Sequence, residues 1–384
     1  MCNTPMDMPN EAHHGRRAFL TATGASAVTA LAGCTGGGSS NSGGSENGSS
    51  SGGGGSGGSG PLRFLGFGGN TQKAQMSVFE GWSENSGTAV KGTSASGTTE
   101  MISLIKQNPG SFDVVALNDT GMARAKQEDV IEPIDLSKVP NYEKNIKKSA
   151  RTLSFNVDGD KTMGLIRENG ATGYAYNSKK IDKELTSWEA VKNPEYEGKV
   201  SLIDRTMDRL SNCAAAAGIN INEVPGSESK KEKMFTEAKE QNKNVFAYWS
   251  DGATSIRYLR QENAWICEAW GGRVLALHEE GGYDHIKYVV PNEGAMGWSD
   301  NLAVVKGSKN TAAAHELLNY TYQREQLLTL SDKMNYTVQV KNPPKKMKQL
   351  PDYAPAEDLA FRDWSALLEK QDAWTQRLDK IKQS

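Results

Sequence analysis

From Leu62 onwards, two patterns of hydrophobic and polar residues alternate along the chain. Short apolar runs bounded by turn residues predict strands, and longer amphipathic runs between them predict helices. This alternation of strand and helix predicts a mostly parallel sheet with helices on both faces. The first series comprises strands at 62–66, 88–92 and 112–117 and helices at 71–84, 98–107 and 120–127.

A second series of the same kind begins after Gly170. Its presence in a chain of 384 residues predicts two compact α/β units rather than one. The expected strands are 172–176, 199–203, 245–248, 264–268 and 286–290, and the expected helices are 186–191, 207–217, 227–241, 252–261 and 272–280. The chain then continues with a strand at 301–305 and helices at 310–322, 324–332 and 356–368.

The loops that follow the predicted strands are candidates for ligand contact. Ligands of open α/β sheets bind at the carboxyl ends of the strands. Small and polar residues in such loops also cap the next helix, so both roles stay open for each of them. In the first series the candidates are Gly68, Gly69, Asn70 and Asp119, and in the second they are Trp249 and Ser250.

The N-terminal segment is typical of an export signal. Arg16 and Arg17 precede a weakly apolar run, 18–32, that is too short and too polar to remain in a bilayer. Twin arginines in this position are typical of the pathway that exports folded proteins. The run ends in Leu-Ala-Gly before Cys34, which resembles a lipobox, so we expect a lipoprotein signal at 1–33 and a lipidated Cys34. The alternative is a cleaved secretion signal beside an incidental cysteine.

The segment after Cys34 is expected to be a flexible tether that extends to residue 60. Gly and Ser make up 22 of the 26 residues from Thr35 to Gly60, a composition that buries nothing. Its root-mean-square span is roughly 30 Å by the estimate for Gly-rich coils. A domain on such a tether can reorient above a membrane without leaving it.

Composition narrows the choice of partners. The 44 Lys and Arg residues balance 46 Asp and Glu residues, which argues against a nucleic-acid partner. The histidines and cysteines show no metal-ligand spacing, and no cofactor is expected. Cys213 and Cys267 follow the leader in an exported chain, where a disulfide between them and two buried thiols are equally compatible with the sequence.

Five stretches carry a resemblance to a known family. Together they resemble, in order and spacing, the spermidine/putrescine-binding receptors of ABC importers over nearly all of residues 62–347. Thr-Ser-Trp-Glu and Asn-Pro-Glu-Tyr-Glu-Gly are typical of the opening of the second lobe, and the others correspond to crossings between lobes and to a cleft strand. The stretches are 186–189, 193–198, 170–177, 268–272 and 291–300.

The resemblance implies a two-lobed, type II periplasmic-binding-protein fold. Lobe I would comprise 61–170 plus 301–384 and lobe II would comprise 171–300. The lobes would close on a polyamine-like cation such as putrescine or spermidine, and the closed shape would be recognised by the importer's membrane subunits. Such a receptor is expected to be a monomer and not an enzyme.

The same resemblance implies which residues meet the ligand. Trp298 and Asp300 match a cleft aromatic residue and an ammonium-binding carboxylate, and Trp270 matches an aromatic residue on another wall of the cleft. Aromatic faces and carboxylates are the groups that attract an organic cation. Asp204 and Asp208 lie near an acidic pair of the family, but Arg205 stands where a carboxylate is expected and would favour an anionic group.

Alternatives to a polyamine receptor remain at this point. The same fold would serve a thiamine-like or amino-acid-like solute, or ferric ion, for which Tyr320 and Tyr322 are a pair without a nearby histidine or carboxylate. A secreted hydrolase would require two carboxylates, for example Asp204 and Asp300, on either side of a scissile bond.

Overall fold

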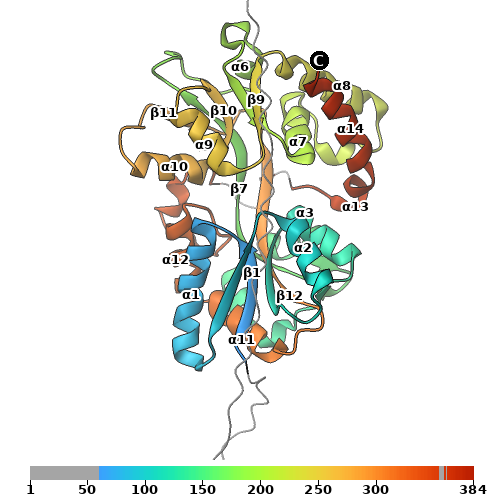
Figure 1. Cartoon of the computed structure of the whole chain (residues 1–384), viewed down its shortest axis with the longest axis vertical. Coiled ribbons are helices and arrows are strands. Elements are labelled where there is room, and N and C mark those ends of the chain that lie inside the picture. The colour runs from blue at the N-terminus through green and yellow to red at the C-terminus, as the bar shows by residue number, and fades with distance from the viewer. Residues whose placement is uncertain (1–59, 354–358, 360) are drawn as a thin grey trace, which may run out of the picture. The chain divides into compact units, whose positions relative to one another are not determined.

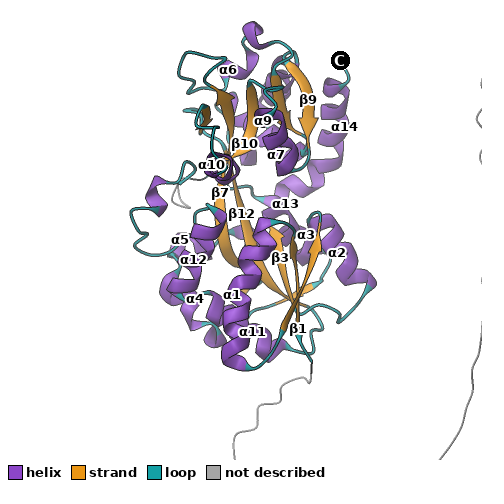
Figure 2. Ribbon diagram, turned by 60° about the vertical axis from the view of Figure 1, so that its left-hand side comes forward, coloured by secondary structure: helices purple, strands orange, loops and turns teal. Residues whose placement is uncertain are grey.

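The computed structural model describes residues 60–353, 359 and 361–384, all of which belong to the unit Gly55–Ser384. The predicted leader, Cys34 and the tether up to residue 59 lie outside the described residues. The described part forms two lobes, each built on one part of a continuous sheet with helices packed around it (Figures 1 and 2).

The first lobe contains the N-terminal series of strands and helices, together with two helices contributed later in the chain. We call this set of elements the first lobe throughout. Its elements are β1 (Leu62–Phe67), α1 (Asn70–Ser86), β2 (Val90–Ala95), α2 (Thr98–Gln107), β3 (Val114–Asn118), α3 (Asp119–Gln127), β4 (Ile131–Glu132), α4 (Pro140–Asn145), α5 (Lys148–Arg151), β5 (Val157–Asp158), β6 (Lys161–Thr162), α11 (Thr311–Thr321) and α12 (Arg324–Met334).

Parallel pairing of β1 with β2 and with β3 builds the sheet of this lobe, as the alternation predicts. Both faces of this sheet are covered by apolar side chains; on one of them the Phe64 ring meets that of Phe79 edge-on at 5.0 Å. Helix α1 is capped by Gly87, which has a positive φ of 71° and whose N–H bonds the carbonyl of Ser83. Glycine favours this left-handed conformation, because a side chain there is strained.

Two long strands, β7 (Leu165–Asn177) and β12 (Met296–Val305), run from one lobe into the other (Figures 1 and 2). They pair antiparallel with each other, and β12 also pairs with β3. All thirteen residues of β7 are buried. The sequence pattern predicts only 172–176 and 301–305 here, because Arg167 and Glu168 lie in the first half of a strand that is buried on both faces.

The second lobe contains the remaining strands and most of the later helices. Strands β8 to β10 pair in parallel, while β10 and β11 lie antiparallel to β7. The elements of this lobe are α6 (Glu189–Lys192), β8 (Val200–Ile203), α7 (Thr206–Ala216), α8 (Glu228–Asn242), β9 (Val245–Trp249), α9 (Gly252–Arg260), β10 (Ile266–Trp270), α10 (Gly271–Glu279) and β11 (Ile286–Val289).

The interior of the second lobe holds a buried ion pair and both described cysteines. Arg209 Nη1 lies 2.8 Å from Glu268 Oε1, which also accepts a hydrogen bond from Asn212. Cys213 and Cys267 are free and buried, so the structure favours the thiol alternative over a disulfide. Burial raises the pKa of the Cys213 thiol to about 12, which leaves it protonated and unreactive.

The C-terminal segment differs from its prediction. The expected helix 356–368 begins among residues outside the description, and the observed helices are α13 (Trp364–Leu367) and α14 (Gln371–Lys382). Helix α13 contacts α3 of the first lobe, whereas α14 packs against α7 and α8 of the second (Figure 1). The assignment of 301–384 to the first lobe is therefore wrong for α14, whose Trp374 packs edge-on against Phe235 of α8.

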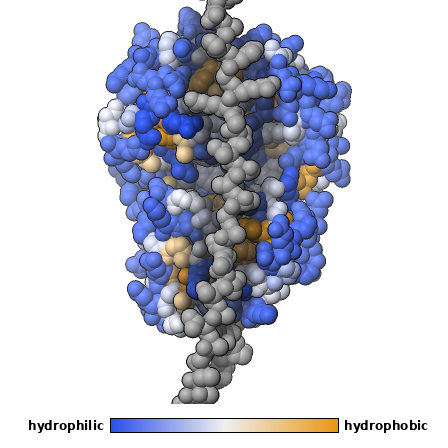
Figure 3. Space-filling model, viewed as in Figure 1, coloured by the Kyte–Doolittle hydropathy of each residue, from blue (hydrophilic) through white to orange (hydrophobic). Residues whose placement is uncertain are grey.

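The surface of the described part is mainly hydrophilic on the face drawn in Figure 3. Two large apolar side chains are exposed among the described residues, Phe246 and Val290. None of the helices in this part of the chain has the length and apolar character needed to cross a membrane.

Candidate ligand-binding site

A cavity of about 270 Å³ lies where the two lobes meet. This volume is near the small end of the range for small-molecule sites, about 300–1,000 Å³. Both lobes contribute lining residues. The lining residues are Phe67, Gly68, Thr71, Ala95, Ser96, Asn118, Asp119, Glu168, Arg205, Asp208, Asp251, Gly252, Trp270, Arg273, Met296, Trp298, Asp300, Tyr336 and Arg362.

The position of the cavity follows from the strand directions. Phe67, Ala95 and Asn118 end β1, β2 and β3, and the loop after each strand opens onto the cavity. In the second lobe, Trp270 ends β10 and Arg205 follows β8 in the same way. The sequence prediction that ligands bind at these strand ends therefore agrees with the place of the cavity.

Two tryptophans form aromatic walls. Trp270 is held by a hydrogen bond from its Nε1 to Thr172 Oγ1 of 3.0 Å, and Trp249 packs edge-on beneath it at 5.1 Å. Trp298 packs edge-on against Tyr336 at 4.9 Å. Trp298 pairs with Gly170 across β12 and β7, and a Cβ at Gly170 would lie 2.7 Å from the indole. Only glycine leaves room for this indole.

Two carboxylates lie side by side at the same level of the strands. Asp300 pairs with Glu168 across β12 and β7, and a β-bulge follows Asp300. Arg167 binds Glu168, with Nε 2.7 Å from Oε2, and its Nη2 lies 3.5 Å from Asp300 Oδ2. Burial, and then the charge of Glu168, raise the pKa of Asp300. A cation in the cavity would relieve this repulsion.

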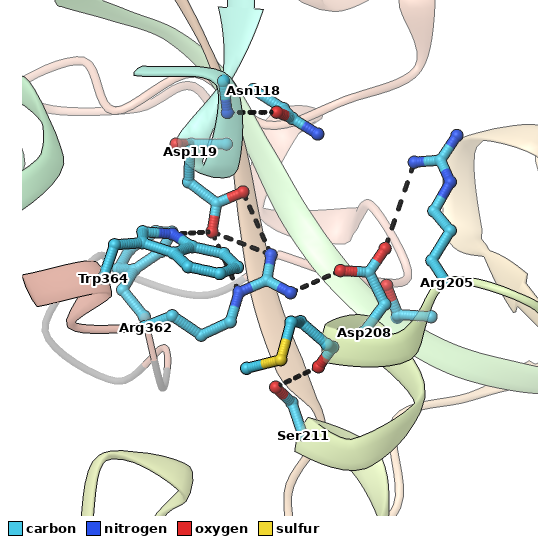
Figure 4. A network of polar contacts seen from close by, with 12 residues as sticks. Asn118, Asp119, Arg205, Asp208, Ser211, Arg362 and Trp364 are labelled. Carbon is cyan, nitrogen blue, oxygen red and sulfur yellow. Dashed lines mark hydrogen bonds and ion pairs between the residues drawn. The ribbon is translucent and has the colours of Figure 1, made fainter. Parts of the chain in front are cut away.

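A second acidic pair is already occupied by a side chain of the protein (Figure 4). The guanidinium of Arg362 bonds both carboxylate oxygens of Asp119 at 2.7–3.0 Å and also bonds Asp208. Asp119 therefore forms an ion pair instead of a helix cap, since Asn118 caps α3 through the N–H of Gly121. Burial raises the pKa of Asp119, whereas the charge of Arg362 opposes that rise.

Arg205 lies at the edge of the cavity between acidic and aromatic groups. Its Nη1 is 3.9 Å from Asp208 Oδ2, and its Cζ is 5.3 Å from the centroid of the Trp270 ring. The side chain is 39% exposed, so it lines the cavity and still faces solvent. The aromatic contact and the ion pair thus hold the Arg205 side chain at the edge of the cavity.

The structure brings together six of the predicted residues and leaves five outside the cavity. Gly68, Asp119, Asp208, Trp270, Trp298 and Asp300 line it. Asp204 is exposed and forms an ion pair with Lys382, and Trp249 is buried behind Trp270. Gly69 and Asn70 are exposed at the start of α1, and Ser250 lines an adjoining depression that shares Asp208 and Asp251.

Sequence reasoning missed several lining residues. Glu168 precedes the predicted strand 172–176, and Tyr336 lies beyond the predicted helix 324–332. Arg362 lies within the predicted helix 356–368 but was not singled out as a site residue. Arg273 occupies the first turn of α10, just after Trp270, where its position after a strand end was a usable signal. Asp251 caps α9 through the N–H groups of Ala253 and Thr254, and its place after β9 was a signal of the same kind.

Comparison with known proteins identifies the family. The model of the family described as bacterial extracellular solute-binding protein matches residues 83–359. This match covers more than half of the chain, which therefore belongs to the family of bacterial extracellular solute-binding proteins.

Individual relatives are more distant. The chain is 26% identical over 228 residues to the spermidine/putrescine-binding periplasmic protein of Escherichia coli K12. The aligned residues make up 59% of this chain and 63% of that protein. It is 23% identical over 287 residues to a gamma-aminobutyric acid-binding protein of Pseudomonas aeruginosa, which covers 72% of this chain and 76% of the relative.

A solved structure agrees in fold. The spermidine/putrescine ABC transporter substrate-binding protein of Streptococcus pneumoniae superposes with a TM-score of 0.72 at 20% identity, covering 84% of this chain and all of that one. The two-lobed type II fold implied by the sequence resemblance is thereby confirmed.

Proposed function

We propose that this chain is the extracytoplasmic receptor of an ABC importer and that it binds a small polyamine such as putrescine or spermidine between its lobes. The observation that carries the proposal is the Asp300 carboxylate, which faces the cavity close to Glu168 and the Trp298 wall. The names of the Escherichia coli and Streptococcus pneumoniae proteins support the same ligand class.

The proposed binding mode places an ammonium group against Asp300. A charge-assisted hydrogen bond to this carboxylate gives the contact direction. The indoles of Trp298 and Trp270 then enclose the methylene chain, and each aromatic face attracts the cation by about 0.5–2 kcal/mol. Because the lining residues come from both lobes, a ligand that contacts them all favours the closed arrangement.

The proposed role is that of a receptor and not of an enzyme. Asp119, Asp208 and Glu168 are held in ion pairs with arginines, so the proposed contact with a ligand cation depends on Asp300. The expected partners are the importer's membrane subunits, which would recognise the closed protein, and the receptor would act as a monomer.

The proposed location is the outer face of the cytoplasmic membrane. Export by the twin-arginine route and lipidation of Cys34 would place it there, with residues 35–60 as the tether. Mass spectrometry of the membrane fraction, with Cys34→Ser as the comparison, tests this part of the proposal. The unaltered chain should carry lipid on Cys34 and stay with the membrane, whereas the variant should not.

A thermal-shift screen tests the ligand class. Putrescine and spermidine should raise the melting temperature, since a ligand at a hundred times its dissociation constant adds about 2.7 kcal/mol of stability. Thiamine, ferric ion and amino acids form the comparison set. A response to one of these without any response to amines would refute the polyamine assignment.

An amino-acid-like ligand is the second candidate. Arg205 and Arg273 also line the cavity, and guanidinium groups bind carboxylates well. An ω-amino acid would place its ammonium on Asp300 and its carboxylate on these arginines. The gamma-aminobutyric acid-binding relative supports this candidate, and the same screen distinguishes it from a polyamine.

A further inference from the structure

The Asp119 and Asp208 carboxylates have the composition of a subsite for an organic cation. Asp119 belongs to the first lobe and is fully buried, and Asp208 belongs to α7 of the second lobe and is 9% exposed. The indole of Trp364 completes the arrangement, since its ring centroid lies 4.7 Å from the guanidinium carbon of Arg362. Two acids and an aromatic face are the groups that hold a cationic ligand.

Arg362 fills this subsite with a cation of the protein itself (Figure 4). Its side chain is 1% exposed, and its fork bonds Asp119 on two sides and Asp208 on the third. Trp364 also donates its Nε1 to Asp119 at 3.1 Å. The charges of Asp119 and Asp208 hold the pKa of Arg362 above its usual range against the opposite effect of burial, so the guanidinium stays charged.

The backbone on either side of Arg362 is fixed to the second lobe. Asn222 donates its Nδ2 to the carbonyl of Phe361 at 2.9 Å and accepts from the N–H of Asp363 at 2.7 Å. Helix α14 then packs on α7 and α8. The backbone at Arg362 is thus bonded to the second lobe, and the guanidinium bonds to Asp119 of the first.

The charges around the cavity show what this arrangement leaves for a ligand. The carboxylates of the lining are Asp119, Glu168, Asp208, Asp251 and Asp300, and the guanidinium groups are Arg205, Arg273 and Arg362, with Arg167 behind Glu168. When all of these groups are counted as ionised, five carboxylates against four guanidinium groups leave one negative charge. Without Arg362 the same inventory would leave two negative charges, with Asp119 and Asp208 free to accept a second ammonium.

We infer that Arg362 determines specificity, because it occupies a cation subsite and restricts the cavity to short amines that place one ammonium on Asp300. An amine that has a larger number of ammonium groups, spaced further apart, such as spermidine, then finds no second acidic pair to bind. Trp298 and Trp270 remain available to enclose a short methylene chain. The preference among amines rests on the proposed function, whereas the presence of a filled cation subsite does not.

The first test uses a small cation to replace the missing side chain. Arg362→Ala should lower the melting temperature, and millimolar methylguanidine should restore part of the loss in this variant while leaving the unaltered protein unchanged. Arg362→Lys keeps a cation and should stay closer to the unaltered protein. An Arg362→Ala protein that methylguanidine does not stabilise would overturn the subsite.

The second test measures the ranking of amines by calorimetry. The unaltered protein should bind putrescine at least tenfold more tightly than spermidine, and Arg362→Ala should narrow or reverse this ratio by tenfold or more. Arg377→Ala is the matched control, because Arg377 lies on α14 and pairs with Glu232 at the surface, away from the cavity. It should keep the original ratio.

Each outcome of the second test decides a separate claim. If Arg362→Ala fails to fold, the unaltered protein still tests the inferred preference for short amines. Spermidine binding as tight as putrescine binding would overturn that preference. An unchanged ratio in a folded Arg362→Ala would do the same. If no amine binds the unaltered protein, the proposed ligand class fails, while stabilisation of Arg362→Ala by methylguanidine would still support the subsite.

Discussion

The Asp300 carboxylate lies 3.5 Å from the Arg167 guanidinium, next to the Glu168 carboxylate that the same arginine binds more closely. The Arg167 guanidinium thus interacts with both carboxylates, and its contact with Asp300 is the longer of the two. Asp300 is also the member of the pair whose side chain is partly exposed, at 16% against 1% for Glu168. It is therefore the carboxylate placed to accept a cation from the cavity.

Amine binding should release protons near neutral pH. Burial and the charge of Glu168 raise the pKa of Asp300 in the empty cavity, so part of the population carries a proton. A bound ammonium favours the charged carboxylate and lowers that pKa, which expels the proton. Calorimetry in two buffers of different ionisation enthalpy measures the release, and Asp300→Asn should remove it. Proton uptake on binding would contradict this account of the site.

Gly170→Ala should weaken both stability and amine binding. The added Cβ would lie 2.3 Å from Asp352 Oδ2 and 2.7 Å from the Trp298 ring, so the indole must move. We expect a loss of about 1–3 kcal/mol of unfolding free energy, as is usual for overpacking. Urea unfolding and an amine titration measure the two effects. Gly226→Ala, at an exposed position with open space around it, is the control and should change neither.

Asp352→Asn should make the protein more stable at alkaline pH. Asp352 is 1% exposed, and burial raises its pKa from 3.8 to about 7. Because the folded state binds this proton more tightly than the unfolded state, the stabilisation is complete below pH 4 and is lost as the pH rises to about 7. An amide has no charge to bury and escapes this loss.

Urea unfolding at pH 5 and pH 8 tests the prediction for Asp352. Between these pH values the unfolding free energy of the unaltered protein should fall by about 2–4 kcal/mol more than that of Asp352→Asn, given about 1.4 kcal/mol for each unit of pKa difference. Asp160→Asn changes an exposed carboxylate and should behave as the unaltered protein does. An equal loss in Asp352→Asn would show that this carboxylate is not strained by burial.

The strand-end rule explains which part of the site could be predicted from the sequence. Gly68 and Asp119 follow strands whose apolar runs are clear, whereas Trp270, Trp298 and Asp300 lie in stretches with a specific family resemblance. Local patterns of residues carry this information, because a strand in an α/β sheet fixes where its carboxyl end points. The alternating βα units of both lobes were predictable for the same reason.

The rest of the site depends on contacts between distant parts of the chain. Arg362 meets Asp119, a residue 243 positions earlier, from a segment that the sequence predicts to be a helix and that carries no sign of this partner. Glu168 was hidden because it lies in a strand buried on both faces, where Arg167 neutralises it and no alternation of apolar and polar residues appears. Such pairings become visible only when the folded chain brings the partners together.

The central claim is that an amine binds in the cavity against Asp300, and titration calorimetry of putrescine into the unaltered protein and Asp300→Asn tests it most directly. A hydrogen bond to a charged group contributes about 1.5–3 kcal/mol, so the variant should bind roughly ten- to a hundredfold more weakly while it remains folded. Equal affinity in the two proteins, or no putrescine binding to the unaltered one, would contradict the claim.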